Sequence, residues 1–237
     1  MKFIADLQDL LNKHGASLVT DGIYGPKTKA ALDKALAGKL VKASEVPKVP
    51  NNVVSLPKAA YFGAPWVGAN IDLLGRYETD KALNERYVPE WKLEGLPGYK
   101  TLVGSKHAWC SLRHNADRRK VGAKGTNSAA ASSWSKWGKK CPFWFGATLD
   151  IKHKSGGRHV CEFLYWINEK KMIAATLDGN RSNQFGVFET DLSGKGDVLV
   201  SGPRWQSDWP DGREVSMAEV ISKYPHLKVG AKGDSTR

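Results

Sequence analysis

Residues 106–115 read KHAWCSLRHN and place Cys110 directly after Trp109, ahead of a strongly polar run. The stretch after Trp109 is predicted to be a helix that begins at Cys110. A thiol at a helix N-terminus lies at the positive end of the helix dipole, which favours the reactive thiolate. These ten residues by themselves allow a nucleophile, a metal ligand or an inert buried thiol, so the rest of the chain has to distinguish them.

The patterns around this stretch predict a mixed domain. Besides the helix at Cys110, helical patterns cover 68–78 and 125–138, the latter with Asn127 or Ser128 as its N-cap. From Phe143 onward, runs of strand-forming residues are separated by turn residues, and they cover 143–151, 158–167, 170–178, 185–192 and 197–202. Helices followed by an antiparallel meander predict an α+β domain with a central antiparallel sheet.

Two later motifs supply partners for Cys110. His159 begins a strand directly after a glycine-containing turn, and Asn180 ends the next strand, with Asp178 close to it. A nucleophilic cysteine needs an imidazole as base and a polar side chain that holds this imidazole in the useful tautomer. We therefore expect Cys110, His159 and Asn180 to form a catalytic triad, and the sequence leaves open whether Asp178 orients the histidine instead.

Other assignments of the titratable residues are weaker. His114 follows Cys110 by one helical turn and could act as the base, whereas His107 is predicted to lie in a loop. Cys141 and Cys161 are expected to be inert buried thiols. Cys161 could in principle join His153 in a metal site, but no pair of closely spaced ligands such as H-E-x-x-H accompanies them, so no metal or other cofactor is expected.

The predicted helix is unusual because only Leu112 and Ala116 in it are plainly apolar. We expect either that this helix is exposed or that Arg113 and His114 line the substrate cleft. A different chemistry, glycoside hydrolysis by the carboxylates of Glu78 and Asp80, has no other support in the sequence.

The first forty residues or so form a separate unit. Apolar residues at helical spacing over 3–13 predict one helix, and Pro26 begins a second that Gly38 closes. Between them, the stretch 21–28 has the spacing D-G-x-x-G-x-x-T. Residues 39–60 are rich in proline and lysine and have no apolar face, as is typical of a linker. All nine tryptophans follow this linker, so the second unit is expected to hold the main core.

Overall composition limits the class of partner. The formal charge of +12 on 237 residues favours polyanions, but lysine and arginine are spread along the chain without a nucleic-acid-binding motif, so we expect no nucleic acid. The polar N-terminus predicts no signal peptide, and no stretch is apolar enough to span a membrane. Three cysteines without short paired spacing indicate reduced thiols.

Two sets of motifs resemble known families. Residues 4–32 resemble the small helical peptidoglycan-binding domain, a three-helix module, which implies wall contacts by Asp21, Tyr24, Gly25 and Thr28. The segments HAWC, GTNSAAASSWSKWG, GGRHV and LDGN resemble the papain-like cysteine, histidine-dependent amidohydrolase/peptidase (CHAP) and NlpC-type families. This second resemblance implies Cys110 as nucleophile, His159 as base and Asn180 as the orienting residue.

Together the resemblances imply a phage endolysin. The implied domains are a peptidoglycan-binding domain at 1–38, a linker at 39–60, a cysteine amidase or endopeptidase at 61–212 and a basic segment at 213–237. A monomer would be made in the host cytoplasm and act on peptidoglycan in the periplasm, with anionic lipopolysaccharide as a second partner. The alternatives are an amidase effector delivered between bacteria and a non-catalytic wall-binding or virion protein.

Overall fold

The computed structural model describes residues 2–20, 26–37, 58–104, 108–154 and 156–230. The chain divides into two compact units, 1–57 and 58–237. Of the expected linker, 39–60, only residues 58–60 lie in the described part of the chain. None of the helices in the described ranges is long and apolar enough to cross a membrane.

The first unit contains helices α1 (Lys2–Lys13) and α2 (Pro26–Ala37) in its described residues. Leu7 and Leu11 of α1 pack against Ala35 of α2, as the apolar spacing predicts. The third helix implied by the family resemblance is not seen in the described residues of this unit. Thr28 is buried and accepts a hydrogen bond from the Gln8 side chain at 3.2 Å, so its hydroxyl joins the two helices.

In the second unit, a helical half precedes a sheet. The helices before the sheet are short apart from α5: η1 (Ala60–Gly63), η2 (Pro65–Gly68), η3 (Ile71–Leu73), α3 (Lys81–Tyr87), α4 (Glu90–Leu93), α5 (Cys110–Lys120) and η4 (Ala131–Lys136). The helix predicted at Cys110 is therefore present. The helices predicted over 68–78 and 125–138 are wrong in length, because only short 3₁₀ turns form within them.

Seven antiparallel strands form one sheet: β1 (Lys139–Lys140), β2 (Thr148–His153), β3 (Arg158–Asn168), β4 (Ile173–Arg181), β5 (Gln184–Asp191), β6 (Asp197–Leu199) and β7 (Arg204–Trp205). Their order is β1-β7-β2-β3-β4-β5, with β6 also paired to β2. A short helix, η5 (Glu169–Lys171), connects β3 to β4. The predicted combination of helices with a central antiparallel sheet is confirmed at this level.

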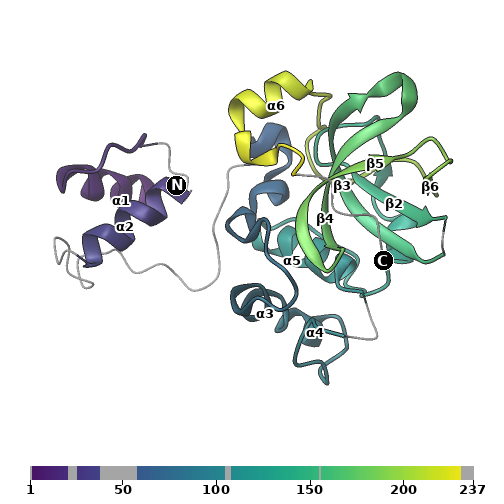
Figure 1. The fold of residues 1–237 in the computed structure, drawn as a ribbon, viewed down its shortest axis with the longest axis horizontal. Helices are drawn as coiled ribbons and strands as arrows, with labels where there is room; N and C mark the ends of the chain where they lie inside the picture. The colour runs from purple at the N-terminus through teal and green to yellow at the C-terminus, as the bar shows by residue number, and fades with distance from the viewer. Residues whose placement is uncertain (1, 21–25, 38–57, 105–107, 155, 231–237) are drawn as a thin grey trace. The chain divides into compact units, whose positions relative to one another are not determined.

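Helix α5 packs against β3 and β4 in the middle of the second unit (Figure 1). Two glycines allow this close packing. A Cβ at Gly179 of β4 would lie only 2.8 Å from the Cδ of Arg113 and 3.0 Å from Cζ3 of Trp109. A Cβ at Gly125 would lie 2.0 Å from Oδ1 of Asn115. The backbone of both neighbouring segments can therefore approach α5 more closely than a side chain would permit.

The C-terminal residues belong to the second unit as far as they are described. After the sheet come α6 (Met217–Lys223) and η6 (Pro225–Leu227). Tyr224 stacks on Tyr61 with ring centroids 4.3 Å apart, and the Tyr165 hydroxyl donates to the Leu227 carbonyl at 3.2 Å. The expected basic C-terminal segment, 213–237, therefore packs on the second unit in its described residues, 213–230.

Candidate active site

Cys110 is the first residue of α5, and Trp109 precedes it as the N-cap. Both side chains are buried, with Cys110 only 1% exposed. The Trp109 ring stacks on Tyr87 of α3 with centroids 6.2 Å apart, and its Nε1 donates to Glu78 at 3.5 Å. These contacts fix the start of the helix, and so they fix the position of the thiol.

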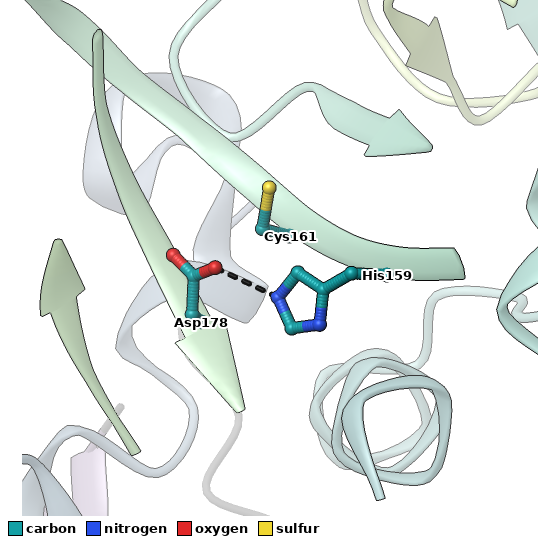
Figure 2. A group of neighbouring side chains, drawn as sticks. All are labelled: His159, Cys161 and Asp178. Atoms are coloured by element: carbon teal, nitrogen blue, oxygen red, sulfur yellow. Dashed lines mark hydrogen bonds and ion pairs between the residues drawn. The ribbon is translucent and has the colours of Figure 1, made fainter. Parts of the chain in front are cut away.

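His159 lies on β3 with a carboxylate held against one of its nitrogens. Its Nε2 is 2.7 Å from Oδ1 of Asp178 on β4, and Figure 2 shows the ring and the carboxylate pointing toward each other. The other carboxylate oxygen, Oδ2, accepts a hydrogen bond from Thr176 at 2.5 Å. Asp178 is fully buried and His159 is 4% exposed. The imidazole is thereby fixed in orientation by a charged acceptor.

His159 is the side chain that acts most strongly on the Cys110 thiol, and it favours the charged form of the sulfur. Because Nε2 of His159 is bonded to Asp178, Nδ1 is the nitrogen left for the sulfur. The backbone of Val160 and of Ser111 acts in the same direction on the thiol pKa. The nucleophile, the imidazole and the carboxylate thus form a continuous chain from α5 through β3 to β4.

The charges in this chain shift both reactive groups. Burial by itself raises the pKa of Cys110, but the positive His159 and the hydrogen bonds to the sulfur outweigh it, so the thiol pKa is lowered. Burial by itself lowers the pKa of His159, yet the Cys110 thiolate and the Asp178 hydrogen bond raise it to about 10. Near neutral pH the geometry therefore favours a thiolate–imidazolium ion pair, the reactive form of a nucleophilic cysteine.

Asn180, the expected orienting residue, is not the partner of His159. It follows the end of the regular β4–β5 pairing, where the register shifts between Asp178 and Arg181, and its φ is 66°. The tight turn at Ser182 and Asn183 follows one residue later, with positive φ at both residues. The structure thus brings Cys110 and His159 together but gives the orienting position to Asp178.

The polar side chains that follow Cys110 do not form a cleft. Residues 110–118 of α5 are all buried, which contradicts the expectation of an exposed helix. The carboxylate of Glu162 on β3 pairs with Arg113 and with Arg118 at 3.2 Å, and it lies 2.9 Å from Nδ1 of His114. Neither Arg113 nor His114 is available to substrate, because both are 0% exposed and face this carboxylate.

We call Arg113, His114, Arg118 and Glu162 the buried charge cluster. Burial lowers the pKa of His114 to about 3, with the two arginines acting in the same direction, so this histidine is neutral and not a competing base. Burial alone would raise the pKa of Glu162, but Arg113 and the other partners hold it well below its usual range. Sequence reasoning missed Glu162, although an acidic residue inside the apolar strand run CEFLYW signalled a buried partner for the basic helix.

Asn115 of α5 binds the backbone of the G-T-N-S segment, residues 125–128. Its Oδ1 accepts from the backbone of Thr126 at 2.7 Å and of Asn127 at 3.2 Å, and its Nδ2 donates to the carbonyl of Ser128 at 3.1 Å. Ser111, next to Cys110, donates to the same carbonyl at 2.6 Å. The extended segment that replaces the predicted helix is therefore bound along α5, beside the thiol.

One group of donors could be considered for a metal ion. Ligand atoms of His159, Cys161 and Asp178 lie within 4.8 Å of one another (Figure 2). However, two ligand atoms of a tetrahedral zinc ion are roughly 3.3 Å apart, which is longer than the 2.7 Å between His159 and Asp178. Burial also raises the pKa of Cys161 well above its ordinary value and keeps its thiol protonated. The arrangement fits a hydrogen-bonded dyad better than a metal site.

The remaining candidates have structural roles or fall outside the described residues. Asp80 caps α3 by accepting from the backbone of Ala82 at 2.8 Å, and it pairs with Arg76. His107 lies outside the described part of the chain. Cys141 is half-buried, and burial raises its pKa to about 12.

The expected wall-contacting residues of the first unit give a mixed result. Asp21, Tyr24 and Gly25 lie outside the described residues, and Thr28 is buried as described above. A hollow of about 280 Å³ lies in the described part of this unit, lined by residues 14–18 together with Ala31 and Lys34 of α2.

Comparisons with known proteins were made at the level of families, of curated proteins and of solved structures. No family model, no curated protein and no solved structure matches the chain. The functional assignment therefore depends on the residues and on their geometry.

Proposed function

We propose that this protein is a cysteine hydrolase that cleaves an amide bond in bacterial peptidoglycan, in the manner of an endolysin. One observation carries the reaction class: Cys110 at the start of α5 is electrostatically coupled to His159, whose Nε2 is held by Asp178 at 2.7 Å. This is the arrangement that nucleophilic catalysis by a thiol requires.

In the proposed reaction, the Cys110 thiolate attacks the amide carbonyl carbon. The tetrahedral intermediate collapses to a thioester when protonated His159 gives its Nδ1 proton to the leaving amine. His159, now neutral, takes a proton from water, which attacks the thioester and releases the carboxylate product and Cys110. Asp178 keeps the imidazole in place through both proton transfers and stabilises its charged form.

The start of α5 supplies donors for the negative charge that develops on the carbonyl oxygen. The first N–H groups of a helix have no partner within the helix, and Trp109, the N-cap, provides no side-chain hydrogen bond to them. The backbone N–H of Cys110 is the group proposed for this oxyanion role.

The substrate class is supported by the sequence. The D-G-x-x-G-x-x-T stretch resembles a peptidoglycan-binding module, and the four segments around Cys110 and His159 resemble wall amidases and peptidases. The charge of +12 favours association with an anionic wall or outer membrane. The same triad attacks either the muramoyl–alanine amide or a bond within the stem peptide.

The test is mass spectrometry of the fragments released from purified peptidoglycan. Peptide-free glycan together with free stem peptide indicates an amidase, and shortened stems still attached to sugar indicate an endopeptidase. We expect Cys110→Ala to lower the rate by at least ~10³-fold. Cys141→Ala is the matched control, and it should keep the wild-type rate. New reducing ends, or lysis by Cys110→Ala equal to wild type, would refute the proposal; the latter would favour a non-catalytic wall-binding protein.

A further inference from the structure

A second histidine–carboxylate pair lies beside the proposed dyad. His153, the last residue of β2, has its Nδ1 2.7 Å from Oδ1 of Asp197 on β6. Its ring centroid is 5.6 Å from that of His159, and the two rings are inclined by 33°. β2 and β3 are paired neighbours, with Ile151 opposite His159, so the strand pairing itself holds the two rings together.

The two histidines differ in exposure. The side chain of His159 is 6% exposed, whereas that of His153 is 33% exposed. His153 is therefore the histidine that solvent, or a ligand, reaches first on this side of the dyad. The neighbouring thiol of Cys110 is only 1% exposed. Most contacts with a bound substrate would therefore come from the side chains that surround this thiol.

The Asp197 carboxylate determines what His153 offers to a ligand. A carboxylate only accepts hydrogen bonds, so it selects the form of His153 that carries a proton on Nδ1. In the neutral ring, Nε2 is then a hydrogen-bond acceptor, and no hydrogen bond from Nε2 to another described residue is observed. A group that donates an N–H is the complementary ligand.

We propose that His153 is a substrate-binding residue whose Nε2 accepts a hydrogen bond from a backbone amide N–H of the stem peptide, next to the bond that is cut. Asp197 acts through His153 as a positioning residue. The inference rests on the proposed function and adds to it a specific contact on the peptide side of the substrate. Carbohydrate hydroxyl groups could also donate, so the assignment to peptide is part of what the experiment tests.

The experiment measures kcat and KM on a soluble muramoyl-peptide and on the same stem peptide without sugar. His153→Ala should raise KM about threefold to tenfold on both substrates, with kcat changed by less than about threefold, because the lost contact is made equally in the ground and transition states. His153→Gln, which keeps an acceptor oxygen near the position of Nε2, should restore most of the lost affinity.

Asp197→Asn provides a second, independent variant. The asparagine amide can donate to Nδ1 and thereby leave the proton of His153 on Nε2, which turns the acceptor into a donor. KM should rise as in His153→Ala, although the histidine is still present. Lys152→Ala is the matched control. Lys152 is the exposed neighbour of His153 on β2, and its side chain points to the opposite face of the sheet.

The rate of Cys110 alkylation by iodoacetamide separates a binding role from an effect on the dyad. It should be the same in wild type and in both His153 variants. An unchanged KM in His153→Ala, or a fall in kcat together with slower alkylation, would overturn the inference. A KM effect seen only with the sugar-containing substrate would also overturn it. If the wild type cleaves neither substrate nor intact peptidoglycan, both proposals fail; if it cleaves them and His153→Ala matches it, only the role of His153 fails.

Discussion

Helix α5 carries two buried polar networks that behave differently. At its first residue, Cys110 raises the pKa of His159, and Asp178, 2.7 Å from the ring, stabilises the charged imidazole. One turn further along the helix lies the buried charge cluster, in which Arg113 and Arg118 form ion pairs with Glu162. Burial keeps His114 neutral there. Both networks shift pKa values strongly, but only the first contains a nucleophile and an acid whose charged forms depend on each other.

The difference shows that a perturbed pKa by itself does not identify a reactive site. In the buried charge cluster both arginines share the Glu162 carboxylate, and Arg113 also pairs with Asp117 at 3.4 Å. Arg118 also lies over the rings of Trp66, Trp134 and Trp137 at 5.0, 4.8 and 4.9 Å. Such a network holds the helix in one position relative to the sheet. The distance between the Cys110 thiol and the His159 imidazole depends on that position, because Cys110 lies on α5 and His159 lies on β3.

The largest effect in this comparison is expected from the orienting residue. Asp178→Asn should lower kcat on muramoyl-peptide by ~10²–10⁴-fold, because the amide no longer stabilises the imidazolium or fixes its tautomer. Asn180→Ala is the control and should change kcat by less than about threefold. If Asn180→Ala were as damaging as Asp178→Asn, Asn180 would be the orienting residue after all.

The next effect concerns the buried charge cluster. Glu162→Ala leaves two arginines buried without their carboxylate and should lower the free energy of unfolding by about 3–5 kcal/mol. Urea unfolding followed by tryptophan fluorescence measures it, since all nine tryptophans lie in the second unit. Glu169→Ala, an exposed glutamate near the end of β3, should change stability by less than about 0.5 kcal/mol. A Glu162→Ala variant of unchanged stability would show that the cluster does not hold the helix.

The smallest effect is on acid stability. His114 is neutral in the folded protein, with a pKa of about 3, whereas in the unfolded chain it takes up a proton near pH 6.5. The unfolded state therefore binds more protons between these values, and stability falls as the pH is lowered from 6.5 toward 3. Glu162 acts in the same direction, because its folded pKa is depressed and its contribution is lost on acidification.

Thermal unfolding at pH 7.0, 5.5 and 4.0 should show Tm lower by about 5–10 °C at pH 4.0 than at pH 7.0. His114→Gln should reduce this dependence, because it removes one group that titrates only in the unfolded chain. A Tm that does not change between pH 7.0 and 4.0 would mean that His114 and Glu162 do not have shifted pKa values in the folded protein. The buried charge cluster would then not differ from a solvent-exposed group of charges.

Much of the architecture follows from local sequence. Apolar spacing predicts α1, turn residues separate the strands of the meander, and the tryptophans mark the unit that holds the main core. The start of α5 at Cys110 and the strand position of His159 are also local properties. These features depend on neighbouring residues, whose influence a single sequence records.

The choice between Asp178 and Asn180 was decided only by the tertiary structure. The two residues lie on one strand with a single glycine between them, so strand alternation alone gives both the same face. The register shift between Asp178 and Arg181 breaks that alternation at Asn180, whose φ is 66°. Such a shift depends on how β4 pairs with β5, which the residues of β4 do not reveal.

The burial of α5 was decided in the same way. Its sequence is typical of a solvated helix, and its lack of an apolar face predicts exposure. The helix is buried because the Glu162 carboxylate of β3, distant in the chain, pairs with both of its buried arginines, and because Gly179 lets it approach β4 closely. By itself the sequence determined which residues are candidates for the chemistry; only the folded chain decided which charges meet, because a buried charge is stable only where its partner is in contact with it.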